Sequence, residues 1–107
     1  MSPQEVISAI GDTVAEIDRT LARPDFPDTD PNFGKMEDMR DQLEDLQQQM
    51  VSAQFAVNST AFLQIASEFS DATHEVRATI SDIRKIGDTI AAIGQVVGIA
   101  QKLLAIA

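Results

Sequence analysis

Apolar residues recur at every third or fourth position in the first part of the chain, as they do on one face of an α-helix. Ser2-Pro3-Gln4-Glu5 precedes them and combines a capping box with proline at the first helical position, which is typical of a helix start. Pro24 ends the pattern, because proline disfavours helical geometry in the residue before it. We therefore predict a short amphipathic helix over residues 3–22. Its apolar stripe is Ile7, Ile10, Val14, Ile17 and Leu21.

Residues 23–34 are predicted to form a loop, since residues 24–34 hold three prolines and three aspartates. A second helix is predicted over residues 35–57, and the Asp30-Pro31 cap signal allows it to begin as early as Pro31. Neither glycine nor proline occurs from Lys35 to Ile86, which favours helix throughout. The stripe of this second helix is Met36, Met39, Leu43, Leu46, Met50, Ala53 and Val57.

A second apolar stripe, which we call the seam, repeats at every seventh residue from Phe55 to Leu104. Such a period is typical of a long helix in a coiled-coil-like bundle, and it predicts one helix over residues 60–106. The seam is out of phase with the preceding stripe, so we expect a turn near residues 57–60, where Asn58 or Ser59 can cap a new helix. A break near Ser70-Asp71 is the alternative. The seam is Phe55, Phe62, Phe69, Val76, Ile83, Ile90, Val97 and Leu104.

The last residues, 87–107, are apolar and carry a row of small side chains beside the seam, which we call the small-residue ridge. Each glycine inside a helix costs about 1 kcal/mol relative to alanine, so the glycines of this ridge need a compensating gain. A helix backbone packed closely against the ridge is the simplest source of that gain. The ridge is Gly87, Ala91, Gly94, Gly98 and Ala105.

An eleven-residue segment near the start of the chain is repeated near its end. Residues 7–17 and 83–93 are identical at seven of eleven positions and share the sequence Ile-Gly-Asp-Thr. One interpretation is a shared packing module in which Gly11 and Gly87 allow close contact. The other is chance convergence of two apolar helices, since short motifs match by chance often.

The charged residues are distributed unevenly, and their acidic balance excludes nucleic acid as a partner. The formal net charge is -9, and residues 1–50 hold twelve acidic residues against four basic ones. Nucleic-acid binding requires a basic surface, so we expect no nucleic-acid partner. Cysteine is absent, and residues 1–6 lack the pattern of a secretory signal peptide. We therefore expect a cytoplasmic protein, or one exported by a dedicated leaderless route.

Few residues suggest a catalytic or metal-binding site. His74 shares a predicted helix face with Asp71 and Glu75, but no nucleophile accompanies them, and a solvated polar face is the better interpretation. Residues 28–32 resemble the start of a calcium-binding EF-hand loop, yet Met39 stands where the loop requires a bidentate glutamate. We predict no catalytic residue, no cofactor and no metal site, and hence no enzymatic activity.

Residues 87–107 also raise the possibility of membrane contact. The uncharged run over residues 89–101 is thirteen residues long, below the roughly twenty that a bilayer span requires. Gly94 and Gly98 have the spacing found in tightly packed membrane helices. A buried or self-associating helix is favoured, and insertion of residues 87–107 into lipid stays as an alternative.

The capped first helix and the Pro/Asp-rich turn with Asp30-Pro31 are followed by Leu43 to Gln47, and then by Ala53 to Thr60, which leads into a second arm. This arrangement of a short capped helix, a turn and a long hairpin-like arm resembles the needle and inner-rod subunits of type III secretion systems. The resemblance covers residues 5 to about 86 and leaves the apolar tail outside it. It implies a small exported protein that polymerises through apolar helix faces without catalysis.

Together these patterns predict an all-α fold in one domain: a short helix, a loop, and then a long helical hairpin or a bundle of about three helices. We expect a non-enzymatic assembly protein that binds copies of itself or another helical protein. The alternatives are a membrane-active, pore-forming type of protein and a cytoplasmic coiled-coil adaptor or secretion chaperone. The predicted assembly residues are the seam together with Gly87, Gly94 and Gly98.

Overall fold

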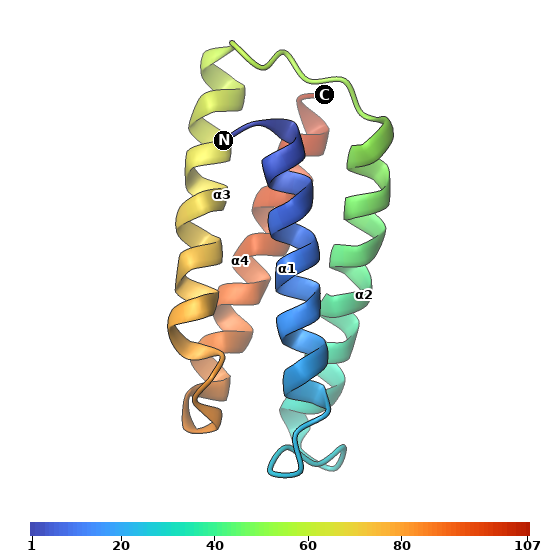
Figure 1. Ribbon diagram of the computed structural model, residues 1–107, viewed down its shortest axis with the longest axis vertical. Helices are drawn as coiled ribbons and strands as arrows, with labels where there is room; N and C mark the ends of the chain where they lie inside the picture. The colour runs from blue at the N-terminus through green and yellow to red at the C-terminus, as the bar shows by residue number, and fades with distance from the viewer.

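Four α-helices form an elongated bundle that contains no β-strand (Figure 1). The computed structural model describes all of residues 1–107, with extents of 44 × 22 × 17 Å. A short 3-10 helix, η1, leads into the last α-helix. The all-α class predicted from the sequence is confirmed. The elements are α1 (Pro3–Leu21), α2 (Pro31–Ser52), α3 (Thr60–Thr79), η1 (Ile83–Lys85) and α4 (Ile86–Ala105).

Helices that follow each other in sequence form two antiparallel pairs, α1 with α2 and α3 with α4, and these pairs share the most extensive contacts. α2 also packs along α4, whereas α1 and α3 meet more sparsely. The order around the bundle is therefore α1, α2, α4, α3. The connection over residues 53–59 crosses one end of the bundle, where both chain termini also lie (Figure 1). A bundle of four helices is observed, and α2 and α3 do not form a packed hairpin.

Each predicted helix start carries the expected cap. Ser2 Oγ accepts a hydrogen bond from the Glu5 backbone N–H at 3.2 Å, and Glu5 Oε1 accepts one from the Ser2 N–H at 3.0 Å, which completes a capping box. Asp30 Oδ1 accepts from the Asn32 N–H at 2.8 Å, so α2 begins at Pro31 rather than at residue 35. Ser59 Oγ accepts from the Phe62 N–H at 3.1 Å and starts α3.

The predicted single helix over residues 60–106 is wrong, and so is the alternative break near Ser70-Asp71. α3 ends at Thr79, and the chain reverses through residues 80–85 before α4 begins. Asp82 has an extended backbone and its carboxylate accepts the Arg84 N–H at 3.0 Å, so it caps η1 without any glycine or proline. The reversal lets α4 cover the apolar face of α3, which an unbroken helix would leave exposed.

The second helix also ends earlier than predicted, at Ser52 rather than residue 57. Ala53 has an extended backbone, and the following segment crosses the bundle instead of continuing along it. The predicted stripe is buried only up to that point. Met36, Leu43, Leu46 and Met50 are buried, whereas the exposed fraction of Val57 is 43%.

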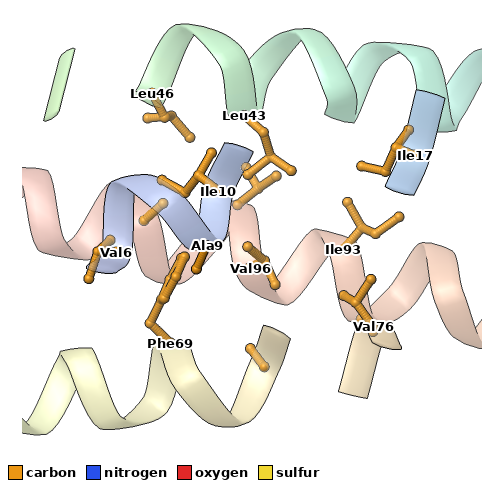
Figure 2. Close-up of a cluster of buried hydrophobic side chains, with 14 of the residues drawn as sticks. Val6, Ala9, Ile10, Ile17, Leu43, Leu46, Phe69, Val76, Ile93 and Val96 are labelled. Atoms are coloured by element: carbon orange, nitrogen blue, oxygen red, sulfur yellow. The ribbon is translucent and has the colours of Figure 1, made fainter. Parts of the chain in front are cut away.

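The core runs along the bundle axis and receives side chains from all four helices (Figure 2). Ile10 and Ile17 from α1, Leu43 from α2, Phe69 from α3 and Ile93 from α4 are fully buried. Their apolar area is removed from water, which is the main term that stabilises such a bundle. The predicted α1 stripe is thus confirmed at Ile10 and Ile17, whereas Ile7, Val14 and Leu21 lie half-buried at the edge of the core.

One close contact joins α1 and α2. Gln47 Nε2 donates a hydrogen bond of 3.0 Å to the backbone oxygen of Ile7. A Cβ atom on Gly11 would lie 2.9 Å from that same nitrogen. The absence of a side chain at Gly11 therefore gives Gln47 room to reach α1.

Candidate functional site

Most residues of the seam, which the sequence predicted to mediate assembly, pack inside the molecule. Phe62, Phe69, Val76 and Val97 are buried in the core between helices. The other members are half-buried and none of them forms an open apolar face. They are Phe55, Ile83, Ile90 and Leu104.

The buried stripe of α4 differs from the predicted one. It contains Ile93, Val96, Ala100 and Leu103, each fully buried, so the seam positions Ile90 and Leu104 lie beside it rather than in it. The chain reverses direction at residues 80–85, so the helical periodicity does not continue from α3 into α4. Residues spaced seven apart across this reversal therefore do not lie on one face of one helix.

The small-residue ridge faces outward and no helix of the chain packs against it. A Cβ atom on Gly87 or Gly98 would meet nothing within 4 Å, and one on Gly94 would meet only Met39 Sδ at 4.0 Å. The expected close approach of another helix backbone is therefore absent within the molecule. The ridge is a shallow exposed strip along α4, and α1 is not its partner.

The repeated Ile-Gly-Asp-Thr segments occupy partly equivalent places. Thr13 in α1 and Thr89 in α4 are both buried. The glycines differ, because Gly11 lies against Gln47 whereas Gly87 has no such neighbour. The repeat therefore marks a similar burial pattern in two helices, with a close contact at only one of the two glycines.

The residues considered for chemistry lie apart from any enclosed site. His74, Asp71 and Glu75 are all exposed on α3. Asp30, from the segment similar to an EF-hand loop, caps α2. No group of three or more His, Cys, Asp or Glu side chains has an arrangement that could hold a metal ion.

The strongest candidate for function is instead one end of the bundle, which we call the apolar end. Five large apolar side chains are exposed on the termini, the end of α2, the connection and the start of α3. Figure 1 shows that these segments lie at the same end of the bundle. Val51 is the most exposed of them at 70%, followed by Leu63 at 52%. Single exposed apolar residues are common, but the grouping of several at one end of a small protein makes that end the candidate interaction surface. The group is Met1, Val51, Val57, Leu63 and Ile106.

The segment that joins α2 to α3 at this end is also free of charged residues. No charged residue occurs between Asp45 and Glu68, a stretch that contains the end of α2, the whole connection and the start of α3. This uncharged stretch is the feature of the sequence that indicates the surface. Helical periodicity does not reveal it, because the stretch spans the end of one helix, a connection and the start of another.

Local contacts hold the connection in place and leave Val57 exposed. The rings of Phe55 and Phe62 pack with their centroids 5.5 Å apart, which anchors the middle of the connection to α3. The Ser59 N–H donates to the Ala56 oxygen at 2.9 Å, and the Ala53 N–H donates to the Met50 oxygen at 3.2 Å. With its backbone fixed in this way, the connection keeps Val57 at the surface.

The opposite end of the bundle is charged. Arg23 forms a bidentate pair with Asp25, at 2.8 and 2.7 Å, and Arg84 pairs with Asp82 at 3.1 Å. Hydrogen bonds from these guanidinium groups hold the pKa of Asp25 and of Asp82 below the usual aspartate range. The two ends therefore differ: the segment that joins α2 to α3 at the apolar end carries no charged side chain, whereas the opposite end, which we call the ionic end, carries these ion pairs.

None of the helices combines the length and the apolar character that crossing a bilayer requires. Compared with known protein families, with curated proteins and with solved structures, the chain matches none of them.

Proposed function

We propose that this chain is a non-enzymatic helical assembly protein whose apolar end binds the apolar end of a second copy. The observation that carries the proposal is the exposure of Val51, Val57 and Leu63 on a segment, residues 46–67, that contains no charged side chain. Their burial between two molecules would release apolar surface from water, at about 25 cal/mol for each Å².

The charge distribution favours a second copy in this orientation. Molecules with a net charge of -9 repel each other, and contact between apolar ends brings together the surfaces that contribute least to that repulsion. The ionic ends then lie at opposite extremes of the pair, each a bundle length of 44 Å from the contact. This separation exceeds the Debye length of about 8 Å at physiological ionic strength, so their mutual repulsion is screened.

The size of the end limits the strength of the interaction. A bundle cross-section of 22 × 17 Å is smaller than the roughly 800 Å² that each partner buries in a stable interface. We therefore expect a weak, reversible dimer whose population rises with concentration, not an obligate oligomer.

Sedimentation velocity at increasing concentration tests the proposal. The double variant Val51→Gln, Leu63→Gln removes two apolar side chains without adding charge, and glutamine is a good helix former. We expect its dimer dissociation constant to rise about tenfold or more, which corresponds to roughly 1.4 kcal/mol. The control Ala78→Gln introduces the same residue type at an exposed position of α3 far from the apolar end, without removing a large apolar side chain, and it should dimerise like the natural sequence.

The other functions considered from the sequence give different results in the same samples. A needle-like or inner-rod-like subunit would form filaments visible by electron microscopy. A membrane-active protein would float with liposomes, and an adaptor or secretion chaperone would stay monomeric and bind a different protein. A strictly monomeric chain at high concentration would contradict the proposed self-association.

A further inference from the structure

The bundle consists of two helical hairpins that are each held together internally. We call α1 with α2 the first hairpin and α3 with α4 the second, and the connection over residues 53–59 joins them. Every side-chain hydrogen bond between two helices lies inside one of these hairpins. Arg40 donates to Asp18 at 2.8 Å in the first, and Lys102 donates to Glu68 at 3.1 Å in the second. Directional contacts therefore specify the geometry of each hairpin.

The contact between the two hairpins has almost no directional bonding. One side-chain hydrogen bond crosses it, from Arg23 Nη1 to the Ser81 oxygen at 3.2 Å. Glu16 of α1 and Arg77 of α3 approach only to 4.0 Å, beyond hydrogen-bond distance, and Glu16 Oε2 is buried without a partner. The hairpins are joined instead by apolar packing, mainly of α2 on α4, since α1 and α3 meet sparsely. Each hairpin can therefore separate from the other without losing its own hydrogen bonds.

The connection is long enough to lead into a second molecule. The contacts that hold it are local, such as the ring packing of Phe55 on Phe62. The eight Cα–Cα steps from Ser52 to Thr60 reach about 26–29 Å when extended, which exceeds the 22 × 17 Å cross-section of the bundle. The connection crosses the apolar end (Figure 1). When two apolar ends meet, it can therefore join α2 in one bundle to α3 in the other.

We propose that two copies of this chain exchange hairpins across their apolar ends, so that the first hairpin of each packs on the second hairpin of its partner. The inference rests on the proposed function, because the two connections pass between the bundles where the apolar ends meet. A second copy is the partner whose hairpin matches the vacated surface by identity. Each bundle keeps the packing between its hairpins, and Val51, Val57 and Leu63 of both chains lie between the bundles.

Exchange changes the lifetime of the dimer. The apolar ends alone form a small interface, which dissociates rapidly. An exchanged dimer dissociates only when the hairpins separate again, and this step is as slow as unfolding. The exchanged form is favoured when the chain concentration approaches the effective concentration that a short connection imposes, on the order of 1 mM.

Co-refolding of isotope-labelled and unlabelled chains tests the exchange. The two are mixed in urea, refolded together at about 1 mM and then diluted about a thousandfold for gel filtration, which removes the weak end contact. We expect a dimer that persists after dilution. Its isotope-filtered NMR spectrum should show NOEs between Met39 of one chain and Gly94 of the other. These residues belong to different hairpins, and a Cβ atom on Gly94 would lie 4.0 Å from Met39 Sδ.

Two matched variants test where the molecule opens. Arg23→Gln removes the hydrogen bond between the hairpins and should speed conversion of the folded monomer to the persistent dimer about tenfold, the equivalent of one charged hydrogen bond. Lys102→Gln removes a charged hydrogen bond inside the second hairpin and should leave that rate unchanged. Circular dichroism verifies that both variants are folded. Equal rates for the two variants would contradict separation between the hairpins.

The double variant Val51→Gln, Leu63→Gln distinguishes the exchange from the end contact on which it rests. We expect several-fold less persistent dimer, because the altered ends face each other in the exchanged form. Equal amounts from the variant and the natural chain would contradict the proposed function but not the exchange. The absence of a persistent dimer, or a persistent dimer without NOEs between Met39 and Gly94, would overturn the exchange. Concentration-dependent sedimentation of chains that were never unfolded would in that case still support the end contact.

Discussion

The hydroxyl oxygens of Thr79 and Thr89 lie 2.8 Å apart and join the last residue of α3 to the first turns of α4. Thr89 is fully buried, and its Oγ1 also lies 3.2 Å from the backbone oxygen of Lys85. The bond spans the reversal at residues 80–85 that gives the bundle its fourth helix. A polar contact inside an apolar bundle favours this geometry of the reversal, because another geometry would remove the interhelical partner and leave Thr89 only the Lys85 oxygen of its own segment.

Thr89→Val should destabilise the bundle by about 1 kcal/mol, since it removes an interhelical hydrogen bond while conserving most of the side-chain shape. Thr13 is the matched control, because it occupies the same place in the repeated Ile-Gly-Asp-Thr segment. Its hydroxyl donates at 2.8 Å only to the Ala9 oxygen of its own helix. Thr13→Val should therefore change stability by less than about 0.5 kcal/mol. Urea unfolding measures both, and equal losses would contradict a specific role for the Thr79–Thr89 bond.

Leu103 and Leu104 distinguish the observed core from the predicted seam. Leu103 is fully buried, whereas Leu104 is half-buried at the edge of the core. Leu103→Ala should cost about 2–5 kcal/mol through lost burial and a residual cavity. Leu104→Ala should cost about 1 kcal/mol, in proportion to its smaller buried area. If thermal or urea unfolding shows a larger loss of stability for Leu104→Ala than for Leu103→Ala, the core of α4 follows the seven-residue seam instead.

The helix starts could be predicted because each is encoded by neighbouring residues. Ser2 with Glu5, Asp30 with Pro31, and Ser59 form local hydrogen bonds that do not depend on the rest of the fold. The reversal at Asp82 has an equally local cap, but it was missed because the apolar period continues through it without glycine or proline. Whether an apolar stripe extends as one helix or folds back is decided by burial against distant segments, which a period alone does not report.

Glycine substitutions should reveal which glycines serve contacts within the molecule. Gly98→Ala places its Cβ in open space and should stabilise the monomer by about 1 kcal/mol through helix propensity. Gly11→Ala forces Gln47 away from the Ile7 oxygen, and the lost hydrogen bond of about 1 kcal/mol offsets the same gain. Unfolding by urea should therefore show a clear gain at residue 98 and little change at residue 11. A destabilised Gly98→Ala monomer would mean that α4 has a close neighbour at this position.

The pH dependence of stability should include a contribution from Glu5. Hydrogen bonds from the Ser2 backbone N–H and then from the Ser2 side chain lower the pKa of Glu5 below its ordinary 4.5. Since the folded-state pKa is lowered, the contribution is present above about pH 4.5 and is lost as the pH falls through the folded-state value. Glu5→Gln removes this proton linkage, so the stability difference between natural chain and variant should shrink as the solution is acidified.

The Ser2→Ala background provides the control for this linkage. Without the serine side chain one of the two pKa-lowering bonds is missing, and the effect of Glu5→Gln should depend less on pH. Thermal unfolding between pH 7 and pH 3 measures all four chains. An identical pH profile for the natural chain and Glu5→Gln would exclude the capping box as a source of acid sensitivity.

The candidate interaction surface is harder to predict from the sequence than the fold. Phe62 and Phe69 belong to a strong periodic pattern, yet strong periodicity identified the core rather than a free surface. Val51, Val57 and Leu63 follow no common period, because they come from the end of one helix, a connection and the start of another. Only the arrangement of these elements brings the three side chains to the same end of the bundle.

Concentration-dependent amide shifts in two-dimensional NMR spectra test self-association through the apolar end most directly. Between about 20 µM and 1 mM, a range suited to a weak interface, we expect progressive shifts at Val51, Val57, Leu63 and Ile106. The small-residue ridge at Gly94 and Gly98 should stay unchanged. Shifts concentrated on that ridge, or spectra that do not change with concentration, would contradict association through the apolar end.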